Sequence, residues 1–367
     1  MIAHKDTVAL DVGPVRAQPA GVGLYAALLA RELMRSTEPD FALIGVRPEG
    51  LLAPTLGEVT FRTFTRRTYH AWMQLAAELD AVAVGARLVH YTNAAAPLAA
   101  RLPYVLTVHD LSVARMPWTH PLARWPIVPI NLVAMARARA VIVPSRFTAR
   151  ELGRIGVSQR RVVVIPHAAA IDQAAAAPGT AVLARLGLEA RRYILYFGTV
   201  EPRKNIERLV GAFERLAAVE PDLKLVLAGA RGWRSDGIDR RIADSPARSL
   251  ISLTGYLPDD ELGELIRESG AVAYVSLYEG FGMPVLDAMA IGAAVVTSRT
   301  TAMPDAAGGA AVLVDPRDET DIANGIVRAL AQHDDLVQRG RERAGRRTWA
   351  DVAGQHRDVY RHALREL

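Results

Sequence analysis

The chain has 367 residues, half of them hydrophobic and 23% charged, which is typical of a globular protein long enough for two domains. It has no cysteine, so disulfides, thiolate metal sites and a cysteine nucleophile are excluded. Residues 1–175 carry 19 Lys and Arg against 12 Asp and Glu, whereas the remainder is slightly acidic. The basic excess fits either a solvated surface or an anionic partner such as a membrane face. No nucleic-acid partner is expected, because the arginines are scattered and no nucleic-acid motif accompanies them.

In residues 1–175, short apolar runs alternate with segments of helical periodicity, which predicts a parallel sheet covered on both faces. The predicted strands are Val8–Asp11, Phe41–Val46, Val59–Phe64, Arg87–Tyr91, Tyr104–His109, Ala140–Val143 and Val162–Ile165. The predicted helices are Val22–Met34, Tyr69–Leu79, Pro121–Ala138 and Ser145–Arg154. The N-terminus shows no signal-peptide pattern and no apolar stretch reaches the length of a membrane span, so a cytoplasmic protein is expected.

The same alternation restarts after an alanine-rich boundary at 168–179. The predicted strands are Tyr193–Phe197, Leu223–Ala228, Leu250–Thr254, Ala271–Ser276, Ala293–Thr297 and Ala311–Val314. The predicted helices are Asn205–Ala218, Pro258–Ser269, Met283–Ala290 and Glu319–Ala331. We therefore expect two doubly wound α/β domains, 1–175 and 176–349, facing each other across a ligand-binding cleft. The amphipathic helix 350–367 is expected to return to the first domain.

A glycine turn follows the predicted strand at 271–276 and leads into a helix. Gly280 and Gly282 allow close approach of the backbone to a ligand, and a helix start offers free N–H groups to phosphate. Glu279 precedes the helix and Asp287 lies inside it, so both carboxylates could accept hydrogen bonds from one ligand's hydroxyls. The alternative is an ordinary strand–turn–helix connection with two incidental acids.

A second turn, 197–205, places Arg203 and Lys204 together in front of another helix, with Asn205 as its expected N-cap. Two adjacent cations can neutralise a diphosphate leaving group. Taken alone, an exposed basic turn is the simpler interpretation. Two phosphate-suited turns in one domain favour a nucleotide-diphosphate site.

Together these motifs resemble the large family of retaining glycosyltransferases of GT-B fold, numbered four in the usual classification. Its members have a glutamate, seven residues and a second glutamate around G-F-G, with an upstream R-K-N turn. The resemblance covers most of the chain. It extends over Thr107–Leu111, Ser145–Phe147, Val164–Pro166, Gly255–Leu257, Pro304–Asp305 and Val314–Pro316.

The resemblance implies a role for each matching residue of the second domain. Glu279 would hold hydroxyls of the donor sugar, Arg203 and Lys204 would clamp the diphosphate, and Asp287 would hold the ribose. Aspartate is one methylene shorter than the family's glutamate, so this chain departs from the pattern there. The remaining donor-binding residues implied are Gly280, Phe281, Gly282, Tyr256 and Leu257.

In the first domain, the resemblance matches Gly21 with a glycine whose backbone touches the phosphate, and His109 with a histidine beside the donor sugar. A core or capping histidine is the alternative for His109. The expected reaction is a retaining transfer, in which the leaving phosphate accepts the acceptor's proton. No D-x-D motif stands in a setting suited to a metal-bound diphosphate, so neither a metal nor another cofactor is expected. The expected donor is a nucleotide sugar resembling GDP-mannose, and the expected acceptor a glycan or lipid-linked sugar.

Three alternatives remain at this point. Gly21–Ala26 superficially fits the G-x-G-x-x-A fingerprint of a nicotinamide oxidoreductase, but it begins about ten residues after Asp11, and the strand 41–46 ends without an acid. A sugar-nucleotide epimerase would share the two-domain architecture. A non-catalytic glycan-binding relative is the third alternative, which the intact Arg203, Lys204 and Glu279 disfavour.

One further segment, 115–128, has two tryptophans, Trp118 and Trp125, among arginines and prolines. Ordinary packing of a loop and helix is one interpretation. The other is a surface that docks an anionic membrane or a lipid-linked acceptor through interfacial aromatic rings and arginines.

Overall fold

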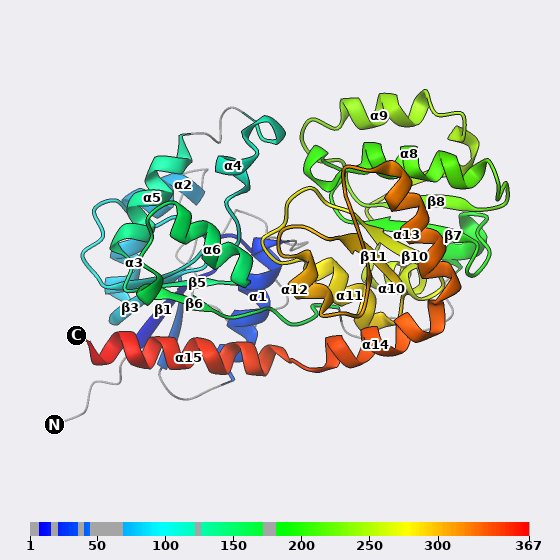
Figure 1. Cartoon of the computed structure of the whole chain (residues 1–367). Coiled ribbons are helices and arrows are strands. Elements are labelled where there is room, and N and C mark those ends of the chain that lie inside the picture. The colour runs from blue at the N-terminus through cyan, green and yellow to red at the C-terminus, as the bar shows by residue number, and fades with distance from the viewer. Residues whose placement is uncertain are drawn as a thin grey trace. The chain divides into compact units, whose positions relative to one another are not determined.

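The computed structural model describes residues 7–15, 21–35, 40–44, 69–121, 126–171 and 181–366. The chain forms two compact units, each with one six-stranded parallel sheet and helices packed around it (Figure 1). The first unit comprises Met1–Leu111, Arg124–His167 and Thr348–Leu367, and the second comprises Ser112–Ala123 and Ala168–Arg347.

This division differs from the predicted boundary after residue 175, because two segments of the predicted first domain belong to the second unit. The backbone N–H groups of Ala170 and Ile171 donate to the carboxylate of Asp287. Trp233 Nε1 donates to the carbonyl oxygen of Thr119 at 2.6 Å. These bonds involve buried or backbone polar groups, which composition alone does not assign to a domain.

The sheet of the first unit has the strand order β2-β1-β3-β4-β5-β6. Its strands are β1 (Thr7–Asp11), β2 (Asp40–Ile44), β3 (Ala86–Tyr91), β4 (Tyr104–Thr107), β5 (Ala140–Val143) and β6 (Val162–Val164). Its longer helices are α1 (Val22–Leu33), α2 (Tyr69–Leu75), α3 (Ala77–Ala83), α5 (Ile127–Arg137), α6 (Arg146–Arg154) and α15 (Trp349–Arg365). Helix α15 begins at a capping box formed by Thr348 and Asp351, and it packs on α1 and β3.

The sheet of the second unit has the order β12-β11-β10-β7-β8-β9. Its strands are β7 (Tyr193–Phe197), β8 (Lys224–Ala228), β9 (Ile251–Gly255), β10 (Ala271–Tyr274), β11 (Val295–Ser298) and β12 (Val312–Val314). Its longer helices are α8 (Ile206–Ala217), α9 (Asp236–Ala243), α10 (Asp259–Arg267), α11 (Met283–Ile291), α12 (Met303–Ala307), α13 (Glu319–Ala331) and α14 (His333–Gly345). Short helices α4 (Ser112–Arg115) and α7 (Val182–Arg185) complete it.

Most predicted strands are present, with ends shifted by one or two residues, whereas the helix predictions need three corrections. The predicted helix 69–79 is broken at Ala76 into α2 and α3. Helix α5 begins at Ile127 rather than at 121, directly after Pro126. Helices α9, α12 and α14 were not predicted, because α9 and α12 are short and α14 is strongly charged. The predicted strand 59–64 lies outside the described residues.

Strands β7 and β10 are neighbours at the centre of the second sheet and run parallel. The turns that follow them therefore emerge at the same edge of the sheet, and they contain Arg203, Lys204 and Glu279. No helix within the described ranges is both long and apolar enough to cross a membrane.

Candidate active site

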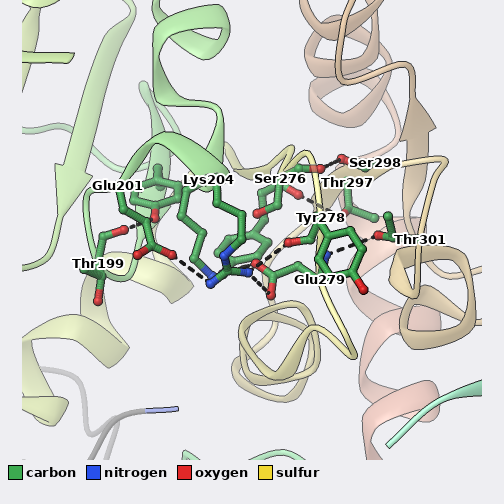
Figure 2. A network of polar contacts seen from close by, with 12 residues as sticks. Thr199, Glu201, Lys204, Ser276, Tyr278, Glu279, Thr297, Ser298 and Thr301 are labelled. Carbon is green, nitrogen blue, oxygen red and sulfur yellow. Dashed lines mark hydrogen bonds and ion pairs between the residues drawn. The ribbon is translucent and has the colours of Figure 1, made fainter. Parts of the chain in front are cut away.

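Arg203, Lys204 and Glu279 form one ion-paired cluster in the second unit. Figure 2 shows this network, with Lys204 and Glu279 labelled. Arg203 Nη1 donates to Glu279 Oε2 at 2.8 Å, and Lys204 Nζ donates to Glu279 Oε1 at 2.6 Å. Arg203 Nη1 also donates to the carbonyl oxygen of Tyr278 at 2.8 Å. The sequence predicted all three charged residues at the site, but not that the two cations would bind the glutamate.

Two further residues, which the sequence interpretation did not assign, complete the cluster. Glu201 Oε1 accepts from Arg203 Nη2 at 2.7 Å, and Tyr274 OH contacts both Lys204 Nζ and Glu279 Oε1. Glu201 is 1% exposed, and among the described residues its second oxygen, Oε2, has no hydrogen-bond partner. The only sequence signal for Glu201 was its place two residues before Arg203. Tyr274 gave none, because it reads as an ordinary strand residue.

The cluster is buried and electrically balanced, with two cations and two carboxylates. Burial by itself would raise the pKa of Glu279, but Arg203 and Lys204 outweigh burial and lower that pKa to about 2. Burial lowers the pKa of Lys204, and Glu279 opposes this effect. Glu279 is therefore an anion at neutral pH and a very weak base.

The backbone around the cluster has positive φ angles at Gly282 and Thr301. Gly282 has a φ of 109° and is the N-cap of α11, and a proline occupies the first turn of that helix. Thr301, whose hydroxyl accepts from Glu279 N at 3.4 Å, has a φ of 60°, which is rare for a β-branched residue. Backbone strain of this kind persists where the surrounding structure enforces it, and it concentrates at functional sites.

Asn205 is the N-cap residue of α8, as predicted, but its side chain does not cap the helix. Its backbone is left-handed, with a φ of 64°, and Nδ2 donates instead to the carbonyl oxygens of Val275 and Pro316. Asn205 thus ties the turn after β7 to the turn after β10, an arrangement that only the tertiary structure provides.

Asp287 lies on α11, 5% exposed, and its Oδ1 accepts from Ala170 N at 2.6 Å and from Ile171 N at 3.2 Å. Burial raises the pKa of Asp287 to about 6, although the two backbone donors oppose that rise. A ribose would therefore have to bind the other carboxylate oxygen or displace these donors.

The remaining predicted donor-binding residues of this unit lie in two places. Gly280 and Phe281 are in the buried turn between Glu279 and α11. Tyr256, which is 53% exposed, and the buried Leu257 follow β9, an edge strand separated from β7 by β8. The structure therefore does not bring Tyr256 to the ion-paired cluster through any contact among the described residues.

The two predicted residues of the first unit lie near each other. Gly21 is the N-cap of α1 with a φ of 52°, and Tyr25 N donates to its carbonyl oxygen at 3.1 Å. His109 follows β4, and its ring contacts the ring of Tyr25 edge-on at 4.7 Å between centroids. His109 Nε2 lies 2.9 Å from the carbonyl oxygen of Thr92, so Nε2 carries the hydrogen. Burial lowers the pKa of His109, while the bond to Thr92 and nearby Asp110 oppose that shift.

Comparison with known proteins now identifies the family. Residues 184–347 match the family described as "Glycosyl transferases group 1", and residues 19–173 match "Glycosyltransferase Family 4". The O-antigen chain mannosyltransferase B of Escherichia coli is 31% identical over 266 residues, which cover 70% of each chain. The chain belongs to this glycosyltransferase family. The alpha-maltose-1-phosphate synthase of Mycolicibacterium smegmatis is 29% identical over 93% of this chain and 95% of its own.

Solved structures confirm the predicted GT-B fold for this glycosyltransferase. Sucrose-phosphate synthase from Thermosynechococcus elongatus has a TM-score of 0.78 and 21% identity, covering 99% of this chain and 100% of its own. The glycosyltransferase WaaG has a TM-score of 0.72 and 14% identity, covering 96% of this chain and 99% of its own. Membership of the family favours sugar transfer over the oxidoreductase and epimerase alternatives.

The segment proposed for membrane docking is only partly described. Trp125 lies outside the described residues. Trp118 is 62% exposed, and Arg234 donates to its carbonyl oxygen, while neighbouring His120 stacks on Trp233. The backbone of this segment therefore packs on the second unit, and the indole of Trp118 remains accessible.

Proposed function

We propose that this glycosyltransferase is a retaining enzyme that transfers mannose, or a related hexose or deoxyhexose, from a GDP-sugar. The acceptor would be a glycan or lipid-linked sugar in the assembly of a cell-surface polysaccharide. The convergence of Arg203 and Lys204 on Glu279 at the edge of the sheet carries this proposal. The similarity to an O-antigen chain mannosyltransferase supports the choice of sugar and acceptor.

A donor diphosphate would enter a site whose charges are already matched. Arg203 and Lys204 are held by Glu201 and Glu279, so phosphate oxygens would take over part of that coordination rather than meet free cations. The N-terminus of α11 follows the same turn and adds its dipole. Freed from one cation, Glu279 could accept hydrogen bonds from sugar hydroxyls. Glu201 Oε2, which has no hydrogen-bond partner among the described residues, offers another buried acceptor.

The low pKa of Glu279 supports a retaining course. A carboxylate with a pKa of about 2 is a poor proton acceptor, so the proton of the acceptor hydroxyl must go elsewhere. The departing diphosphate is the base on the same face of the sugar. The bond between the anomeric carbon and the phosphate oxygen breaks, the bond to the acceptor oxygen forms, and the proton moves to the phosphate. Arg203 and Lys204 stabilise the charge that develops on the diphosphate.

Within the described residues, no cluster of three or more His, Asp or Glu side chains is arranged to hold a metal ion. We therefore propose a metal-independent transfer. The test is incubation of the purified protein with a panel of nucleotide sugars and mannose-containing acceptors, with and without excess chelator. GDP-mannose turnover in chelator, with NMR showing the donor's anomeric configuration in the product, is the expected result. Turnover that requires added magnesium or manganese would overturn the proposed metal independence. An inverted product would overturn the proposed retaining mechanism.

A further inference from the structure

A chain of buried hydrogen bonds runs through the first unit and joins α15 to α1, β4 and β3. It consists of five contacts: His356 Nδ1 to Val352 O at 2.8 Å, His356 Nε2 to Tyr25 OH at 2.8 Å, Tyr25 OH to Thr107 Oγ1 at 2.9 Å, Thr107 Oγ1 to His90 Nε2 at 2.8 Å, and His90 Nδ1 to Tyr360 OH at 2.7 Å. All five of the side chains involved are 0% exposed.

The direction of every bond in this chain follows from its first member. A carbonyl oxygen only accepts, so His356 Nδ1 carries a hydrogen and the Nε2 of a neutral His356 must accept. Tyr25 then donates to His356, Thr107 donates to Tyr25, and His90 Nε2 donates to Thr107. His90 Nδ1 is left to accept from Tyr360.

The hydrogens of this chain balance when both histidines are neutral. The five side chains then supply one hydrogen each for the five contacts. A proton added to either imidazole would break this pattern, because the hydroxyl of Tyr360 would have to give up its donation to His90 Nδ1 or two hydrogens would meet in one buried contact. Burial and the neighbouring His356 and His109 also lower the pKa of His90 well below its usual value.

Tyr25 connects this chain to the predicted donor-contacting residues. Its N–H donates to Gly21 O, its ring contacts His109 at 4.7 Å, and its hydroxyl bonds Thr107, two residues before His109. His167 lies on the same ring at 4.8 Å between centroids. Tyr25 thus has contacts to Gly21, to His109 and to the strand that leads to His109.

We infer that Tyr25 is a positioning residue, which the hydrogen-bond chain through His356 locks in one orientation so that Gly21 and His109 keep a fixed geometry. His109 then presents its unprotonated Nδ1, because Nε2–H is bonded to Thr92. The expected effect of Tyr25 on catalysis rests on the proposed function. The assignment of hydrogens does not depend on that function.

Two measurements test the inference. In protein with 15N-labelled histidine at about pH 7, NMR should show His356 as the Nδ1–H tautomer and His90 and His109 as neutral Nε2–H tautomers. Any of them charged, or either His356 or His90 in the other tautomer, would overturn the assignment whether or not the protein transfers sugar. Absence of transfer with every donor, with these tautomers present, would instead contradict the proposed function alone.

The second measurement compares Tyr25→Phe with Tyr104→Phe. Tyr104 lies on the same strand as Thr107, is 3% exposed and donates one hydrogen bond, to Ala134 O, so Tyr104→Phe likewise removes one buried tyrosine hydroxyl. Tyr25→Phe should lower kcat at least about tenfold with a smaller change in KM, because small misplacements of reacting groups are costly. Tyr104→Phe should keep kcat within about twofold. Equal kcat values in the two variants, at equal loss of thermal stability, would reduce Tyr25 to a packing role.

Discussion

The two units contain buried polar clusters of opposite character. The cluster of the second unit, Glu201, Arg203, Lys204 and Glu279, is built from full charges in balance. The chain of the first unit, which runs through Tyr25, is built from neutral groups whose hydrogens are all assigned. Charges can exchange one partner for another, so the charged cluster of the second unit suits a ligand that brings negative charge. The neutral chain of the first unit has one pattern of hydrogens and suits holding its side chains in a fixed geometry.

The two clusters also differ in how they respond to a substitution. Removing one charge from a buried ion-paired cluster leaves the partner charge uncompensated. The resulting loss of stability exceeds the net stabilisation that the ion pair provided. Removing one hydroxyl from the neutral chain leaves a donor or acceptor unpaired, at a cost of about 1–3 kcal/mol.

Glu279→Gln should have the largest effect on stability, because it removes the carboxylate that pairs with both Arg203 and Lys204. A loss of about 3–5 kcal/mol is expected, measured by thermal and urea unfolding. The same variant should bind GDP more tightly than the unaltered protein, since the diphosphate no longer competes with a carboxylate. GDP binding that weakens in Glu279→Gln would contradict the partner-exchange mechanism.

Lys204→Ala and Arg203→Ala should each reduce turnover by about a hundredfold or more, because one charge-stabilising contact to the leaving group is lost. Lys204→Ala is the cleaner variant, since Arg203 still holds both Glu201 and Glu279. The matched control is Arg231→Ala, which removes an arginine that is 63% exposed and paired with Asp239. Near-normal turnover in both cluster variants would exclude a diphosphate clamp.

Acid should weaken the first unit before the second. His90 is neutral in the fold, so the unfolded state gains a proton below about pH 6.5 and stability falls by about 1.4 kcal/mol per pH unit. The pKa of Glu279 is lowered instead, so its contribution is complete above about pH 4.5 and is lost as the pH falls toward 2.

The protein is unfolded in urea at each pH, and hydrogen-exchange pulse labelling at one fixed pH then shows which of the two units has unfolded. His90→Gln should flatten the acid loss of the first unit between about pH 6.5 and 4.5. His362→Gln is the control, because that histidine is 76% exposed on α15. Simultaneous loss of both units above pH 4.5 would refute the assignment to His90.

The smallest effect concerns the exposed indole of Trp118, which neither cluster uses. If this surface docks an anionic membrane, Trp118→Ala should reduce sedimentation with anionic vesicles at low salt by a few-fold, and salt should weaken binding of the unaltered protein. Val219→Ala, at a residue 74% exposed in the second unit, is the control. Equal binding to neutral vesicles, or no binding at low salt, would contradict membrane docking by Trp118 and would restrict its role to packing of its loop.

Much of the architecture was predictable because local patterns and fold rules agree. Buried-type strands such as Tyr193–Phe197 and Ala140–Val143 are recognisable from their apolar runs, and Glu319–Ala331 from its helical period. The turns after β7 and β10 were recognisable as a pair, because parallel strands deliver the residues that follow them to one edge of the sheet. This reasoning was enough to bring Arg203, Lys204 and Glu279 to one site.

The residue types that stand at each turn can be read from the sequence, whereas the groups that those residues bind depend on the tertiary structure. Nothing in the local pattern indicates that Asn205 bonds Val275 and Pro316 rather than capping its helix. Similarly, Tyr25 and His356 are 331 residues apart, and only the return of α15 to the first unit pairs them. Buried polar groups need partners that periodicity cannot name, because hydrogen bonds depend on the positions of single atoms, whereas apolar burial depends only on which face a residue occupies.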